Sequence, residues 1–180
     1  MPATAPIRPA TPAAPPPLPS GLRRDDAPQR RACQRLLALA YDSRQLCLHA
    51  AERLEAAPLQ TLLLAMATER GHLLRGLGQR CDLSLAEAMQ ADLGVFDTEM
   101  QIRRAEALRA LGRPQDHPRV IEALLAAESA TLGEIESEIE TLRRDADYGA
   151  LQQRLGRMRA HLGRLRSLAR NTTAPLAIAQ

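Results

Sequence analysis

The sequence predicts an all-α fold: an up-down helical bundle with a long helical crossover, preceded by a disordered Pro/Ala-rich arm. The 180 residues are rich in Ala and Leu, and only three of them are aromatic. Ala and Leu lose little side-chain freedom in a helix, whereas the β-branched and aromatic residues that favour strands are scarce here. Apolar residues recur at helical spacing from Cys33 onward. A chain of this length is large enough to bury one core.

Both ends of the chain are predicted to lie outside the bundle. Residues 1–27 form the Pro/Ala-rich arm, which has too little apolar bulk to build a core and no apolar stretch typical of a secretory signal. A flexible tether is favoured over a proline-rich docking peptide for this arm. Residues 171–180 are predicted to be a flexible tail, so the bundle itself spans residues 28–170.

The first two helices of the bundle are predicted over residues 28–56 and from Pro58 onward, fraying near Gly76 and Gly78. Pro58 suits the first turn of a helix, where its missing amide is not needed. Each helix has one apolar stripe at the 3-4 spacing of a bundle seam. The stripes are Cys33, Leu36, Ala40, Ser43, Cys47, Ala50 and Leu54 in the first helix, and Leu59, Leu62, Leu63, Met66, Leu73 and Leu77 in the second.

A connecting helix is predicted over residues 84–111, with an interruption near Gly94 left open. Ser84 and Glu87 have the spacing of a capping box, in which each side chain bonds the other residue's backbone amide. A helix of this length spans about 40 Å. It can therefore return the chain to the far end of the bundle, which makes the second and third bundle helices parallel.

The last two helices are predicted from Asp116-His117-Pro118 to about Arg144 and from near Asp147 to Arg170. The third carries glutamates and the fourth carries arginines, so opposite charges can flank their shared seam. Alternatively, the fourth helix could offer a basic surface to RNA or anionic lipid. A net charge of +3, without lysines or interleaved aromatics, disfavours nucleic acid.

Several classes of chemistry are excluded or disfavoured. All 24 basic residues are Arg, which excludes a Schiff-base lysine and a phosphate-loop lysine. Cys33, Cys47 and Cys81 show no CxxC spacing, so we expect buried, reduced thiols. No apolar run is long enough to span a bilayer, and a cytoplasmic protein is expected.

One set of residues could hold a metal ion inside the bundle: Glu69, His72, Glu128 and His161. Glu69 and His72 form an ExxH pair on one helix face, as in di-iron bundles. Glu128 lies in the middle of the apolar stripe of the third bundle helix, where a carboxylate is costly unless it is paired. The chain arrangement above brings these residues and His161 to similar depths. A structural interpretation is a buried network of Glu69 and Glu128 paired with Arg70, a histidine or water.

A complete di-iron set is not evident in the sequence. The first bundle helix must supply a carboxylate, but its candidates Asp42 and Glu52, like His49, project away from the apolar stripe. The fourth helix offers Met158 where a second ExxH pair needs Glu. We therefore expect a scaffold rather than an oxidase.

Short motifs resemble those of a ferritin-like family of bacterial four-helix proteins whose function is unknown. The motifs are Tyr41-Asp42, Ala50-Ala51-Glu52, Glu69-Arg70 and Ala127-Glu128, and the resemblance covers about residues 30–170. It implies a ferritin-like bundle with acidic positions at Asp42, Glu52, Glu69 and Glu128, and it implies no established activity. The long middle helix departs from that family.

The favoured expectation is a non-enzymatic helical bundle that self-associates as a homo-oligomer, with no cofactor assigned. One alternative is a ferritin-like metal-binding or stress-related protein that uses iron or another divalent metal at the four residues above. Another is a membrane- or nucleic-acid-associated module that acts through the basic last helix.

Overall fold

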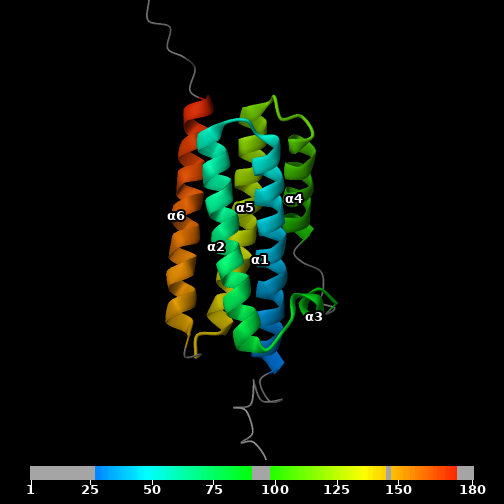
Figure 1. Cartoon of the computed structure of the whole chain (residues 1–180), viewed down its shortest axis with the longest axis vertical. Helices are drawn as coiled ribbons and strands as arrows, with labels where there is room; N and C mark the ends of the chain where they lie inside the picture. Colours follow the sequence, from blue (N-terminus) through cyan, green and yellow to red (C-terminus); the bar gives the residue numbers. More distant parts are fainter. Residues whose placement is uncertain (1–26, 91–97, 145–146, 174–180) are drawn as a thin grey trace, which may run out of the picture.

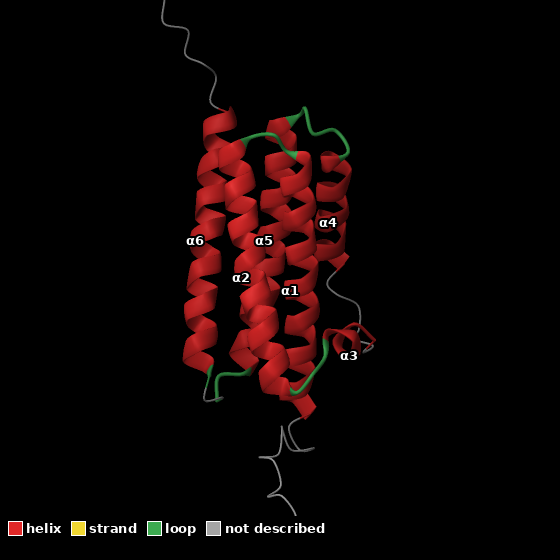
Figure 2. Ribbon diagram, in the orientation of Figure 1, coloured by secondary structure: helices red, strands yellow, loops and turns green. Residues whose placement is uncertain are grey.

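The computed structural model describes residues 27–90, 98–144 and 147–173, so the predictions for the arm before Ala27 and for Gly94 lie outside the described residues. The helices are α1 (Ala27–Arg53), α2 (Ala57–Cys81), α3 (Leu85–Gln90), α4 (Thr98–Leu111), α5 (His117–Thr141) and α6 (Tyr148–Thr173) (Figure 1). Loops join α1 to α2, α2 to α3 and α4 to α5, and there is no strand among the described residues (Figure 2). The all-α prediction is confirmed.

Four long helices surround the core. The helix α1 packs against α2 and α5, and α6 packs against the same two helices from the other side. The helices α2 and α5 run antiparallel to both α1 and α6, and parallel to each other (Figure 1). This is the direction that the length of the crossover predicts.

The crossover differs from one continuous helix over residues 84–111. It contains two helices, α3 and α4, and residues 91–97 between them lie outside the described residues. The helix α3 packs against α1 and buries Ala88, whereas α4 packs mainly along α5. Because the two parts of the crossover have different neighbours, they do not share one axis (Figure 1).

The apolar stripes predicted for α1 and α2 form the core: every residue of both is buried. The stripe predicted for the third bundle helix is buried as well, including its two polar members. It consists of Ile121, Leu124, Glu128, Thr131, Ile135 and Leu142. Burying a Leu or Met side chain stabilises a fold by about 1.5–3 kcal/mol. The bundle is therefore held mainly by leucines of the four long helices.

Helix ends follow the predicted signals in most places. The amide of Glu87 donates to Oγ of Ser84 at 3.1 Å, and the amide of Ser84 donates to Oε2 of Glu87 at 2.7 Å, which confirms the capping box. The hydroxyl of Ser84 also donates to Oε2 of Glu87 at 2.7 Å, and this bond, together with the one from the Ser84 amide, lowers the pKa of Glu87. The fraying expected at Gly76 and Gly78 is wrong, because buried Leu77 and Cys81 hold the last turns of α2 in the core.

The last helix ends later than predicted. The helix α6 continues to Thr173, beyond the predicted end at Arg170, and residues 174–180 lie outside the described residues. The end of a helix is set by one or two backbone hydrogen bonds, so a shift of a few residues changes no argument about the core.

The three cysteines are buried as predicted, but two of them are not reduced thiols. Cys33 near the start of α1 and Cys81 at the end of α2 form a disulfide, with their Cα atoms 6.7 Å apart. The third, Cys47, is a free cysteine. The two cysteines meet because the antiparallel packing of α1 and α2 places the start of α1 beside the end of α2.

None of the helices in the described residues is both long and apolar enough to cross a membrane.

Candidate functional site

The centre of the bundle holds a buried carboxylate, Glu128 of α5, which is 1% exposed. The hydroxyl of Ser43 in α1 lies 3.0 Å and 2.9 Å from its two oxygens. Nη2 of Arg70 in α2 donates to Oε2 at 2.9 Å. Three helices therefore supply the groups that meet at one carboxylate.

Arg70 is also 1% exposed, and it completes the network by a second bond. Its Nε donates to Oγ of Ser43 at 3.0 Å, so the hydroxyl accepts from Arg70 while it donates to Glu128. A buried charge pair is tolerated when its geometry is good and further hydrogen bonds satisfy it. Ser43 supplies such bonds to both charges.

Cys47 lies one turn after Ser43 and is fully buried. Burial raises the pKa of its thiol well above the ordinary value, and the negative charge of Glu128 raises it further, against a smaller opposing effect of Arg70. Because the thiolate is the nucleophilic form, this cysteine stays protonated and unreactive at neutral pH.

Glu69 belongs to a different group of contacts. Its Oε1 accepts from Nη1 of Arg154 and from Nε of Arg157, both at 3.2 Å. These arginines come from α6, so Glu69 ties α2 to α6 at the edge of the core rather than joining Glu128. The prediction that Glu69 and Glu128 share one network is therefore wrong, because Glu69 turns toward α6.

The two histidines also lie apart from the hydrogen bonds of Glu128. Nδ1 of His72 is 2.9 Å from Nη2 of Arg75, one turn further along α2. Burial lowers the pKa of His161, and the charges of Arg164 and Arg70 lower it further, while Glu69 raises it. Nδ1 of His161 and Nη1 of Arg70 are buried without a hydrogen-bond partner among the described residues. A neutral imidazole is the form that tolerates these cationic neighbours.

The candidate residues of α1 face outward, as the face angles predict. Asp42 bonds to Arg104 of α4, with Oδ2 and Nη1 2.5 Å apart, and Glu52 is exposed. Asp42 therefore holds the crossover against the bundle. Neither residue contributes to the interior around Glu128.

The structure does not gather the four predicted metal ligands into one donor set. In residues 27–90, 98–144 and 147–173, no three His, Cys, Asp or Glu side chains form a group that could hold a metal ion. At Glu128 the donors present do not fit a divalent metal. A metal bound there would have to displace the guanidinium of Arg70 and leave a buried cation unpaired beside it.

Some partners in these networks can be read from the sequence and others cannot. Arg70 can be identified as a partner because it lies next to Glu69 in the sequence. Ser43 can be identified because it is the only residue with a hydroxyl in the apolar stripe of α1. No pattern in the sequence identifies Arg154, Arg157 and Arg104 as the partners of acids on other helices. Their pairing depends on how each helix is rotated about its axis.

No family model, curated protein or solved structure matches this chain, so the chemistry of the interior rests on its own geometry. The interior network consists of one carboxylate, one guanidinium and one hydroxyl that use each other as partners. The thiol beside them is protonated. This arrangement neutralises charge inside the core and offers no activated nucleophile.

Proposed function

We propose that the protein is a non-enzymatic, self-associating scaffold of ferritin-like architecture, in which a buried ion pair stands where such bundles bind metal. The observation that carries this proposal is the position of Arg70, whose guanidinium lies 2.9 Å from Glu128 and is 1% exposed. A fixed cation supplied by the chain neutralises the interior carboxylate.

The order and direction of the helices support the ferritin-like part of the proposal. Two antiparallel pairs, α1 with α2 and α5 with α6, are joined by a crossover that makes α2 and α5 parallel (Figure 1). One long crossover between two helical hairpins is the connection found in ferritin-like bundles. The resemblance of residues 30–170 to a ferritin-like family points the same way.

The donor set supports a structural role. A di-iron bundle directs a carboxylate inward from each of four helices and adds two histidines. Here Asp42 bonds to Arg104, Glu69 bonds to two arginines of α6, and Glu128 bonds to Arg70. Each of these three carboxylates thus already has a basic partner in the chain.

The surface supports self-association. Among the residues that the structure describes, four large apolar side chains are exposed by 43–50%: Leu64, Met89, Ile102 and Leu108. In α6, Gly156 and Gly163 have open space where a Cβ would lie. Glycine weakens the interior of a helix. A glycine on an exposed helix face is therefore favoured where a neighbouring helix packs closely against that face.

Metal analysis tests the proposal against the metal-binding alternative. Protein purified without a His tag should contain no stoichiometric iron, manganese or zinc by mass spectrometry, and added iron should leave its melting temperature unchanged. One bound metal per chain, lost in Glu128→Gln and in Glu69→Gln, would instead support the ferritin-like metal protein.

Light scattering coupled to size exclusion tests self-association. The chain of 19.7 kDa should elute at a multiple of that mass. Replacing Leu64 or Ile102 by Glu places a charge on one exposed apolar site without touching the core, and at least one of these variants should elute as a monomer. Because association depends on concentration, a parent protein that is still monomeric at about 100 µM would contradict this part.

A further inference from the structure

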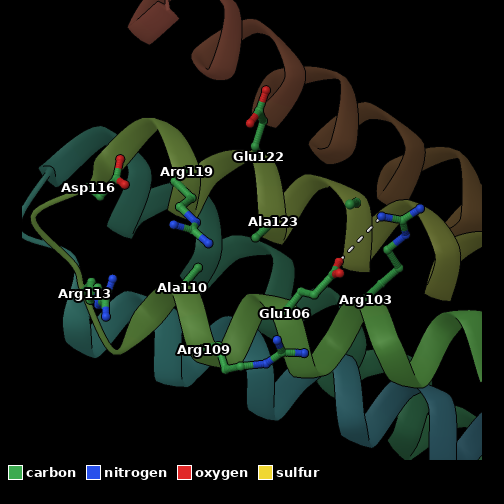
Figure 3. Close-up of a pocket in the computed structure, with 10 residues that line it drawn as sticks. Arg103, Glu106, Arg109, Ala110, Arg113, Asp116, Arg119, Glu122 and Ala123 are labelled. Carbon is green, nitrogen blue, oxygen red and sulfur yellow. Dashed lines mark ion pairs between the residues drawn. The ribbon is translucent and has the colours of Figure 1, made fainter.

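A polar groove lies between α4 and α5, close to the loop over residues 112–116 that joins them (Figure 3). Its volume is about 670 Å³, which lies in the range of small-molecule sites. Arginines and acids form its walls, and three alanines form the rest of its lining. The residues of this groove are Arg103, Glu106, Arg109, Ala110, Arg113, Asp116, Arg119, Glu122, Ala123 and Ala126.

The arginines of the groove differ in how they are paired. Arg103 forms ion pairs with Glu99 and Glu106 at 3.4 Å and 3.5 Å. By contrast, Arg109, Arg113 and Arg119 form no ion pair with any acid in the described part of the chain. Arg109 donates through Nε to the carbonyl of Ala105, which leaves its terminal nitrogens available. Three cations without an acidic partner in the described helices and loops therefore line one groove.

The acids of the groove do not offset these three cations directly. In Figure 3, Arg119 reaches from α5 toward Ala110 of α4, whereas the carboxylates of Asp116 and Glu122 point away from α4. Glu122 also lines a second hollow between α5 and α6, together with Arg166 and Arg170. Glu106 of α4 is paired with Arg103, so no acid of the groove forms an ion pair with Arg109, Arg113 or Arg119 in the described part of the chain.

We propose that this groove binds a phosphate-bearing small molecule of about nucleotide size. Guanidinium groups bind phosphate through paired N–H donors. Arg109, Arg113 and Arg119 come from α4, the connecting loop and α5, so a ligand in the groove would meet arginines from more than one element. The alanines Ala110, Ala123 and Ala126 form the apolar part of the lining, against which the remainder of the ligand would lie. This site is separate from the interior network and does not depend on the proposed scaffold role.

Calorimetric titration of the full chain with ATP, and separately with inorganic pyrophosphate, tests the site. The variant Arg113→Gln/Arg119→Gln removes two groove arginines. The matched control Arg143→Gln/Arg144→Gln removes two arginines after α5, at the other end of that helix, so both variants have the same net charge. All four side chains are exposed, and urea unfolding should show that both variants are folded. Arg119→Glu is a second groove variant that reverses one charge.

We expect ATP to bind the parent protein and the control variant alike, and the groove variants about tenfold or more weakly, since each lost bond to a charged group weakens binding substantially. Pyrophosphate should bind more weakly than ATP, because it cannot contact the alanines. Equal loss in the groove and control variants would overturn the site, as would no binding of either probe. Binding only to a single-stranded oligonucleotide, or only to anionic vesicles, would overturn it in favour of a macromolecular partner.

Discussion

Arg70 of α2 and Glu128 of α5 meet at the centre of the bundle, with Nη2 and Oε2 2.9 Å apart and both side chains 1% exposed. Two parallel helices are thus joined by a charge pair inside a leucine-rich core. The pair has a third partner, because the hydroxyl of Ser43 from α1 bonds to both charges. The polar centre therefore fixes the relative rotation of three helices.

Ser43→Ala should destabilise the fold by about 1–3 kcal/mol, because a buried carboxylate and a buried guanidinium each lose a hydrogen-bond partner. Urea unfolding followed by circular dichroism measures this change. Ser167→Ala is the matched control, since Ser167 is exposed and its hydroxyl bonds to a carbonyl of its own helix. The control should change stability by less than about 0.5 kcal/mol. Equal effects of the two substitutions would contradict the network.

The titration of His161 should reveal the cationic surroundings of its ring. Because burial and the charges of Arg164 and Arg70 lower its pKa below the ordinary 6.5, the folded protein binds fewer protons than the unfolded chain just below that pH. The free energy of unfolding should therefore fall as the pH drops through 6.5 toward the folded pKa. Imidazole signals in an NMR titration give the value directly.

Arg164→Gln removes one of these cations from an exposed position and should raise the pKa of His161 toward 6.5. Arg53→Gln, an exposed arginine at the end of α1, should leave the titration unchanged. A pKa at or above 6.5 in the parent protein would show that the ring does not face Arg164 and Arg70 as described.

The Cys33–Cys81 disulfide should respond to reductant. It closes a loop with a sequence separation of 48 residues, and a disulfide of that span typically contributes about 2–4 kcal/mol. Dithiothreitol should lower the urea midpoint of the parent protein and of Cys47→Ala, but not that of Cys33→Ala/Cys81→Ala. Unfolded, unreduced protein should show one free thiol.

The same thiol count bears on where the protein folds. Disulfides persist in oxidising compartments and are rare in the cytoplasm of mesophiles. Lysis of the cells directly into denaturant that contains an alkylating agent should modify Cys47 and leave Cys33 and Cys81 unmodified if the bond forms in the cell. Three alkylated cysteines would contradict the disulfide and would agree with the cytoplasmic location expected from the sequence.

Gly156→Ala and Gly163→Ala should each stabilise the isolated chain by about 0.5–1 kcal/mol, because alanine is the better helix former and a Cβ meets nothing within 4 Å at either position. At Gly112 a Cβ would lie 3.1 Å from the carbonyl oxygen of Arg109, so Gly112→Ala should bring no gain. Thermal unfolding in dilute solution compares the three variants. Destabilisation by the α6 substitutions would show that this face is packed against something.

Much of the fold follows from local patterns in the sequence. The stripes of α1, α2 and α5 identify the buried faces because a helix buries one side at a fixed period. The Ser84–Glu87 capping box marks the start of α3 for an equally local reason. The change of neighbour along the crossover is harder to predict, since Ala88 packs on α1 while α4 follows α5, and no local pattern specifies two different neighbours.

The interior network can be predicted from the sequence only in part. Glu128 can be identified because a carboxylate in an apolar stripe needs a partner, and Arg70 is among the partners that the sequence predicts. The pairing of Glu69 with arginines of α6 cannot be predicted in this way, because it depends on the rotation of α2 against α6. The disulfide escapes prediction for a similar reason: Cys33 and Cys81 have no motif spacing, and only the antiparallel register of α1 and α2 brings them together.

A double-mutant cycle on Arg70 and Glu128 tests the central claim most directly. Urea unfolding of Arg70→Met, Glu128→Gln and the double variant gives their free energies of unfolding. Each single substitution should cost about 3–5 kcal/mol because it leaves one buried polar partner uncompensated. The double variant should be clearly more stable than the sum of the two losses predicts. Additive losses, or single variants as stable as the parent protein, would contradict a buried ion pair at the centre of this bundle.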